Sequence, residues 1–207
     1  PVASATNLGD LFISEYLEGS STNKALELYN GTGAPVDLAA GSYALDFYIN
    51  GSTVVSSSVT LSGTIANGDV YVIANPTADP LILAQADATN AAINFNGNDV
   101  IVLRHGAAFL DIFGQLGNDP GTIGWGTDPT NSVDNDLVRK SIVNVGDTNG
   151  NDAFDPATEW DGFVIDTFSN LGSHVNDASS AGGGGSDDGS VAAQVSVPSS
   201  AACIEIS

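Results

Sequence analysis

Hydrophobic residues recur along this chain in short runs separated by glycine, asparagine and aspartate. Eight runs are rich in β-branched or aromatic residues, which is typical of β-strands. They cover residues 11–18, 24–30, 43–49, 53–61, 70–74, 100–104, 108–114 and 136–143. In the second run Leu26 and Leu28 share one face and Glu27 and Tyr29 share the other, as alternate residues of a strand do. The pattern predicts an all-β protein.

The segments between these runs carry turn signals. Five Asn-Gly dipeptides begin at Asn30, Asn50, Asn67, Asn96 and Asn149. Because Asn and Gly tolerate positive φ, this pair suits tight hairpins, and many hairpins indicate an antiparallel sandwich or barrel. Residues 79–87 differ from this pattern. They combine a capping aspartate, a proline in the first turn and good helix formers, which predict one short helix.

The composition changes near residue 177. Residues 177–190 are rich in Gly, Ser and Asp, which predicts a flexible linker between a domain over 10–176 and a tail over 191–207. Residues 1–9 form a separate N-terminal segment. The β-branched residues that give the tail a strand-like alternation are Val191, Val195, Val197, Ile204 and Ile206. A strand this short cannot fold alone, so we expect it to pair with its own sandwich, a following domain or a neighbouring subunit.

The formal net charge is −21, because 25 acidic residues face only 4 Lys and Arg. Such a chain lacks the basic side chains that replace counterions on a phosphate backbone, so we expect no direct nucleic-acid binding. No apolar run is long enough for membrane insertion. The chain starts at Pro1 and contains no Met. A removed signal peptide explains this, as an excised segment would, and we expect a secreted, extracellular protein. The single Cys203 cannot form an intramolecular disulfide.

Side chains that carry oxygen crowd residues 146–160. Calcium takes six to eight oxygen ligands. The candidate ligands are Asp147, Asn149, Asn151 and Asp155, with Asp152 and Glu159 in reserve. The first three have the spacing of an EF-hand loop, but Asp152 stands where that loop needs glycine and Thr158 where it needs glutamate. A calcium ion would therefore be structural and would pin a long loop to the sandwich. The alternative is a series of Asx-turns, which need no metal.

The other candidate sites have simpler interpretations. An acidic cluster within residues 128–136 is expected to be a solvated loop. His105 and His174 have no neighbouring pattern of a catalytic triad or a zinc site, so we expect no enzyme. Arg139 and Lys140 are expected to pair with internal carboxylates. Trp125 and Trp160 are more typical of a core than of a glycan-binding platform.

Three motifs near the start of the chain resemble the bacterial lamin-tail domain. They are Ile13-Ser14-Glu15, Glu27-Leu28-Tyr29-Asn30 and Val36-Asp37-Leu38. Residues 96–117 are similar to the late hairpin of that family. Residues 134–140, 146–160 and 168–174 resemble a subset found in large secreted bacterial nucleases and surface proteins. The resemblance covers residues 10–175 and implies an immunoglobulin-like antiparallel β-sandwich. It carries no catalytic residue over to this chain.

Three functions are compatible with these observations. The first is a secreted structural or interaction module that forms a homo-oligomer or filament, by adding its tail or N-terminal segment to the sheet edge of a neighbour. The alternative is the N-terminal accessory domain of a secreted metal-dependent nuclease, which the length of the parent reading frame would decide. The third is a calcium-stabilised adhesin that binds glycan.

Overall fold

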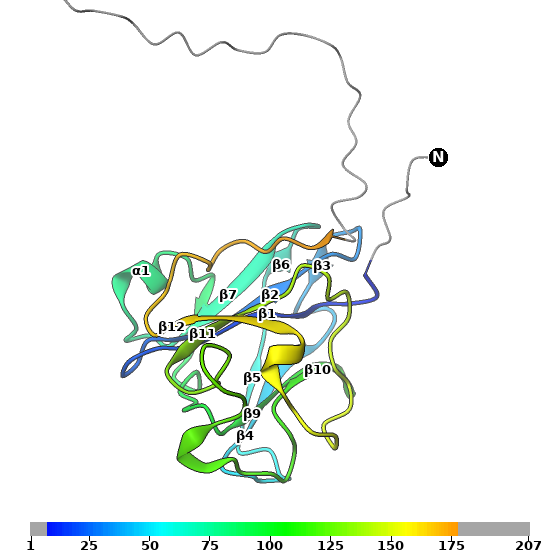
Figure 1. Ribbon diagram of the computed structural model, residues 1–207. Coiled ribbons are helices and arrows are strands. Elements are labelled where there is room, and N and C mark those ends of the chain that lie inside the picture. The colour runs from blue at the N-terminus through cyan, green and yellow to red at the C-terminus, as the bar shows by residue number, and fades with distance from the viewer. Residues whose placement is uncertain (1–7, 178–207) are drawn as a thin grey trace, which may run out of the picture.

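The computed structural model describes residues 8–177, which form two main β-sheets packed as a sandwich (Figure 1). The six-stranded sheet has the order β12-β11-β1-β2-β7-β8, and the four-stranded sheet has the order β10-β9-β4-β5. A small third sheet pairs β3 with β6. All pairs are antiparallel except β7 with β8. The fold class is therefore the expected one, an immunoglobulin-like all-β sandwich with one short helix.

The strands are β1 Phe12–Glu18, β2 Lys24–Tyr29, β3 Val36–Asp37, β4 Tyr43–Tyr48, β5 Ser57–Thr60, β6 Thr64–Ile65, β7 Val70–Ala74, β8 Ala88–Thr89, β9 Val100–His105, β10 Ala108–Phe113, β11 Asn135–Arg139 and β12 Trp160–Val164. The helical segments are α1 Pro80–Leu83 and the 3₁₀ turns η1 Gly121–Ile123 and η2 Pro156–Thr158. Each of the eight predicted runs overlaps a strand, and β9 and β11 extend one residue beyond their runs. The strand β12 and the two-residue strands β3, β6 and β8 were not predicted.

The predicted helix is present but shorter than expected. Asp79 caps it, since its side chain accepts a hydrogen bond from the backbone N–H of Leu81 at 2.8 Å. The helix ends early because residue 87 returns to the sheet. The N–H of Asp87 donates to the carbonyl of Val72 at 2.9 Å, and its carboxylate accepts from the N–H of Val72 at 2.9 Å.

Only one of the five Asn-Gly pairs has positive φ at both positions. Asn50 and Gly51 have φ of 51° and 71°, and the N–H of Ser52 donates to the carbonyl of Ile49 at 3.1 Å. This closes a tight turn within the connection from β4 to β5. At Asn30 the side chain instead serves a different purpose, because its amide donates to the carbonyl of Ile65 at 2.9 Å.

The main core lies between the two large sheets. Tyr16 is fully buried there and stacks on Phe113 and Phe95, with ring centroids 3.9 and 4.7 Å away. Both tryptophans are buried as well, Trp160 in this core and Trp125 in an adjoining cluster.

A second apolar layer covers the outer face of the six-stranded sheet. Residues 166–177, which we call the strap, run along this face from α1 towards β3 (Figure 1). Leu171 of the strap and Ile82 of α1 pack on Leu17, Ala25 and Val72 of the sheet. Every residue of β1 and β2 is consequently buried. The alternation seen in the sequence therefore does not separate a solvent-exposed face of the sheet from a buried one.

Candidate functional site: the acidic loop and the edge strand β12

The acidic loop, residues 146–159, connects β11 to β12. Four of its predicted calcium ligands line a cavity of about 290 Å³, namely Asp147, Asp152, Asp155 and Glu159. The side chains of Asn149 and Asn151 are not part of that lining. Burial raises the pKa of Asp147, and the negative charges of Asp152 and Asp111 add to this effect. The structure therefore brings together the four carboxylates and leaves the two amides outside.

Several of these side chains bind backbone amides of their own loop. The carboxylate of Asp147 accepts from the N–H of Asn149 at 2.8 Å, and the side chain of Asn149 accepts from the N–H of Asn151 at 3.3 Å. Asp155 caps η2 by accepting from the N–H of Ala157 at 3.1 Å. These are the Asx-turns that the metal-free interpretation expects.

An ion-pair network attaches the acidic loop to the sandwich. Arg139 of β11 pairs with Asp111 of β10 and, at 2.5 Å, with Glu159 of the loop. Asp111 also accepts the backbone N–H groups of Ile13 and Asp147, both at 2.8 Å. The side chains of Arg139 and Asp111 are each 1% exposed. Arg139 thus attaches the acidic loop to the sandwich.

A metal ion requires several ligand side chains that lie close together. Between residues 8 and 177, no three side chains of His, Cys, Asp or Glu form a group that could hold a metal. Calcium can take amide and carbonyl oxygens in place of some carboxylates. Calcium at the acidic loop consequently stays a proposal.

Both histidines pack against aromatic side chains of the sandwich. His105 ends β9, stacks on Tyr43 with centroids 4.4 Å apart, and lies 3.0 Å from the carboxylate of Asp10. His174 of the strap packs edge-on against Phe12 and Tyr29. Burial, together with the charge of Arg139, lowers the pKa of His174 to about 4.

The strand β12 is an outer edge of the six-stranded sheet. It pairs with β11 from Arg139 opposite Trp160 to Asn135 opposite Val164, and the N–H of Lys140 donates to the carbonyl of Glu159 at 2.9 Å. Hydrogen-bonded and non-hydrogen-bonded pairs alternate in an antiparallel ladder. The backbone groups of Trp160, Gly162 and Val164 are therefore directed away from β11.

The other edge strands are better protected against pairing. The strand β8 has two residues, and β5 has four with the polar sequence Ser-Ser-Val-Thr. The strand β10 carries a bulge between Phe109 and Asp111, and the acidic loop lies beside it through the bond from Asp147. Short length, bulges and covering segments are the usual protections of sheet edges. The five residues of β12 have no bulge, and their protection is limited to the charge of Asp161 and the 129–130 backbone that lies against Gly162.

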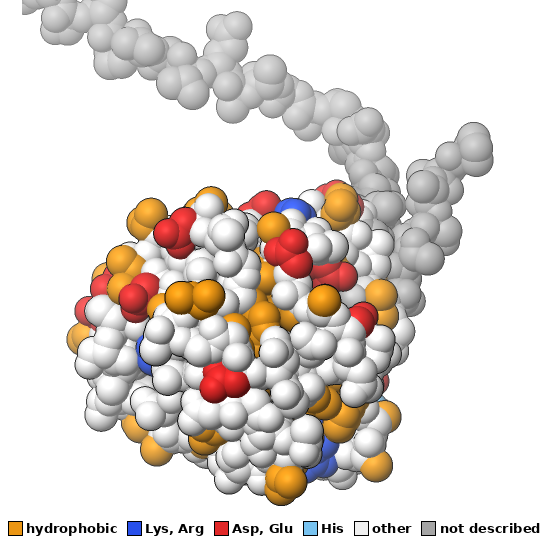
Figure 2. All heavy atoms as spheres, turned by 60° about the horizontal axis from the view of Figure 1, so that its bottom comes forward, with side chains coloured by type: hydrophobic (Ala, Val, Ile, Leu, Met, Phe, Trp, Pro, Cys, Tyr) orange, Lys and Arg blue, Asp and Glu red, His pale blue; other side chains and the backbone are white. Residues whose placement is uncertain are grey.

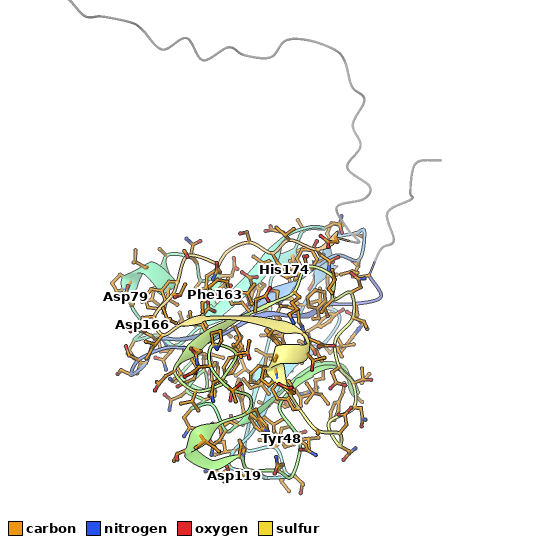
Figure 3. The ribbon with its side chains drawn as sticks, viewed as in Figure 1. Tyr48, Asp79, Asp119, Phe163, Asp166 and His174 are labelled. Atoms are coloured by element: carbon orange, nitrogen blue, oxygen red, sulfur yellow. The ribbon has the colours of Figure 1, made fainter. Side chains whose placement is uncertain are left out.

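Apolar side chains surround the open end of β12. The exposed fractions of Phe163, Val164 and Ile165 are 37, 72 and 41%. Val164 and Ile165 also line a hollow of about 580 Å³, together with Ile123, which is 74% exposed, and Pro129. Figure 3 shows Phe163 on β12 between Asp166 and His174 of the strap. The lining of the hollow also includes Asp128 and Asp134, so an open edge lies next to a hollow that is apolar in part.

All four basic side chains of the chain are engaged internally. Lys24 pairs with Glu18, Arg104 pairs with Asp46 at 2.8 Å, and Arg139 belongs to the network above. Lys140 differs from the expectation, because its ammonium donates to backbone carbonyls of residues 157 and 158 at 2.6 and 3.2 Å. The accessible charge is therefore mostly acidic, as the face in Figure 2 shows.

The sequence missed three acidic residues that the fold buries together. Glu15, Glu27 and Asp136 are each at most 1% exposed. Asp136 lies in the stretch expected to be a solvated loop, but it belongs to β11 and the strap covers it. A possible signal was present, since all three are acidic residues within apolar strand runs.

These features define the class of the protein as an immunoglobulin-like β-sandwich with an uncovered edge. The family model of the lamin tail domain matches residues 4–117, which is more than half of the chain. The chain belongs to the lamin tail domain family, whose immunoglobulin-like fold is a non-catalytic one. No curated protein and no solved structure matches it. Within residues 8–177 no helix is long and apolar enough to cross a membrane.

Proposed function

We propose that this lamin tail domain is a non-enzymatic module that associates with other chains by strand addition at β12. The observation that supports the proposal is the open edge, where the backbone groups of Trp160 and Gly162 and the N–H of Val164 face no partner strand. The carbonyl of Val164 accepts from the N–H and the hydroxyl of Thr167, at 3.2 and 2.7 Å. An added strand gains affinity from main-chain hydrogen bonds and specificity from pockets for alternate side chains. The apolar part of the hollow beside Val164, formed with Ile123 and Ile165, would supply such a pocket.

We infer that the added strand is the tail segment 191–197 of a second copy. This segment lies outside the described residues, and its sequence VAAQVSV carries no charge, which suits an edge on an acidic surface. Its Val195 and Val197 are separated by one residue, so both would face the hollow. The N-terminal segment 1–9 is the second candidate donor.

The linker is long enough for this exchange. The N–H of Asp177, at the end of the strap, donates to the carbonyl of Ser141 at 2.8 Å, close to where β12 begins. A linker of the length of residues 178–190 has a root-mean-square span of roughly 20 Å. A five-residue strand is about 17 Å long. The tail is therefore able to reach the edge of an adjacent copy.

Sedimentation of the full chain at increasing concentration tests the proposal. The net charge of −21 opposes close approach of copies, so association should be stronger at 0.5 M than at about 0.05 M salt, where screening is weaker. Val164→Lys should abolish association, because a charge on an edge strand disfavours pairing. Val54→Lys is the matched control, since Val54 is 71% exposed but lies outside β12. Monomers at all concentrations, unchanged by deletion of residues 178–207, would contradict the proposal.

We also propose that the module acts outside the cell, where a diffuse acidic surface favours solubility in salty surroundings. The alternative is an accessory domain of a secreted metal-dependent nuclease. A parent reading frame that continues into such a catalytic domain would support this alternative. Glycan binding is a third proposal, and a glycan array with and without chelator tests it.

Structural calcium at the acidic loop is a separate proposal. Its support is the convergence of Asp147, Asp152, Asp155 and Glu159 on one cavity. An ion that binds only the folded state raises the melting temperature. Calcium should therefore raise the melting temperature of the full chain relative to the chelated protein, and magnesium should raise it less.

A further inference from the structure

Three carboxyl groups meet on the outer face of the six-stranded sheet, beneath the strap. Glu15 of β1 stands directly opposite Glu27 of β2. Asp136 of β11 lies diagonally from Glu15, because Leu17 pairs with Asp136 and Glu15 pairs with Val138. Long side chains reach one another across such a diagonal. Three acidic groups are thus close together in a place that water does not enter.

The strap supplies part of the hydrogen bonding that these groups need. The side-chain amide of Asn170 donates to Asp136 at 2.9 Å, and the backbone N–H of Gly172 donates to Glu27 at 2.8 Å. The hydroxyl of Ser14 donates to the other oxygen of Glu27 at 2.7 Å. Glu27 is therefore satisfied on both oxygens, and Asp136 on one.

The remaining carboxyl oxygens have no donor if all three groups are ionised. Both oxygens of Glu15 and Oδ1 of Asp136 are buried and receive no hydrogen bond from residues 8–177. The four basic side chains of the chain are engaged elsewhere, as described above. An unpaired carboxylate is strongly disfavoured in such a site, and the group takes up a proton instead. The two groups are close enough for a hydrogen bond once one of them carries a proton.

We propose that Glu15 and Asp136 share one proton at neutral pH, and that this protonated pair holds the strap on the six-stranded sheet. The carboxyl O–H of Glu15 donates to Oδ1 of Asp136, which leaves Oδ2 of Asp136 to accept from Asn170 of the strap. Loss of the proton to solvent would leave two adjacent carboxylates. Release of the strap would then be favoured, because it exposes both groups to water. The strap continues into the C-terminal tail, so the pair would act as a pH-sensitive clasp at the base of that tail.

The direction of the pH dependence follows from the surrounding charges. Burial, with the charges of Asp136 and Glu27, raises the pKa of Glu15 far above its usual value, and burial also raises that of Glu27 to about 7. A raised carboxyl pKa contributes stability that is complete below about pH 4.5 and is lost as the pH rises through the folded-state pKa. The clasp should therefore weaken with rising pH.

Three other charged or titratable groups lie near the clasp, namely Arg139 of β11, Asp161 of β12 and His174 of the strap, which line a neighbouring hollow. Asp161 is exposed, and His174 has its pKa lowered to about 4. His174 is therefore neutral in the folded chain above pH 7. The interval from pH 8 to 9 consequently isolates Glu15 within the cluster, since Glu27, with its pKa of about 7, is largely ionised there and tyrosine and lysine titrate only above it.

Infrared spectroscopy of the full chain at about pH 8.5, where Glu27 is largely ionised, observes the proton directly. We expect absorption from a protonated carboxyl group, lost in Glu15→Gln and retained in Asp161→Asn. Absence of that absorption in the unmodified chain would overturn the proposal, as would its disappearance on addition of calcium, which would assign a cation to the pair. This measurement needs no variant to give its main result.

Hydrogen–deuterium exchange then tests the clasp, on the unmodified chain at a concentration where it is monomeric. After correction for intrinsic rates, the opening equilibrium of residues 168–174 should rise about tenfold per pH unit between pH 8 and 9, as loss of one proton requires. Glu15→Gln should remove this dependence, because its amide donates to Asp136 at any pH, and Asp161→Asn should keep it. The same pH dependence in Glu15→Gln would refute the clasp. The inference does not depend on strand addition at β12, and neither result depends on the other.

Discussion

Replacing Asp111 by alanine should destabilise the domain more than any replacement of an exposed acid. The side chain of Asp111 is 1% exposed and serves Arg139, the N–H of Ile13 and the N–H of Asp147. Removing one partner of a buried ion pair costs about 3–5 kcal/mol, and Arg139 would keep only Glu159, which is 37% exposed, as a charged partner. For a domain of this size, about 2–4 °C of melting temperature is lost per kcal/mol. The expected decrease is therefore roughly 6–20 °C.

Urea unfolding followed by tryptophan fluorescence measures this effect. Trp160 is a suitable probe, since the Arg139 guanidinium lies 4.4 Å from its ring centroid. Asp161→Ala is the matched control, because Asp161 is an exposed acid on the adjacent strand and should change the free energy of unfolding by less than about 0.5 kcal/mol. A loss below about 1 kcal/mol in Asp111→Ala would refute the reasoning, because the pair would then behave as an exposed one.

Three further outcomes are expected. Chelation of calcium should lower the melting temperature of the full chain if the acidic loop holds the ion, and it should lower that of an Asp152→Asn variant by less. Equal decreases in the two proteins would contradict a calcium site at the acidic loop. Gly162→Ala should destabilise the domain by about 1–3 kcal/mol or more, because a Cβ there would lie 1.8 Å from the carbonyl oxygen of Pro129, and normal stability on urea unfolding would contradict that packing. The free energy of unfolding should fall as the pH drops from 6.5 to 4.5, because the lowered pKa of His174 means that the unfolded chain binds the proton more tightly than the folded one. His174→Phe should reduce this fall, and an equal fall in the variant would contradict the lowered pKa.

The strands were predictable because their signal is local. Runs such as residues 70–74 combine β-branched residues with flanking turn residues, and β7 has those bounds. The strand β12 escaped prediction because Asp161 and Gly162 interrupt its apolar pattern. Gly162 is required there by the approach of the 129–130 backbone, which no local pattern reveals.

The charged interior could not be predicted for a related reason. Asp111 and Arg139 are 28 residues apart and belong to different sheets, so only the closed sandwich brings them together. The same holds for Glu15 and Asp136. Sequence alternation places Glu27 on the face opposite Leu26, but the strap that buries this face is encoded some 140 residues later. The acidic loop shows the converse, because its Asx-turns are local and the sequence suggested them correctly as one alternative.

Amide exchange along β12 tests the open edge most directly. The amides of Gly162 and Val164 point away from β11, whereas those of Asp161 and Phe163 belong to its ladder and serve as internal references. Strand addition predicts that exchange at Gly162 and Val164 slows as the concentration of the full chain rises, and that deleting residues 191–207 abolishes this protection. Exchange at Gly162 and Val164 that is equally fast at every concentration would contradict the account.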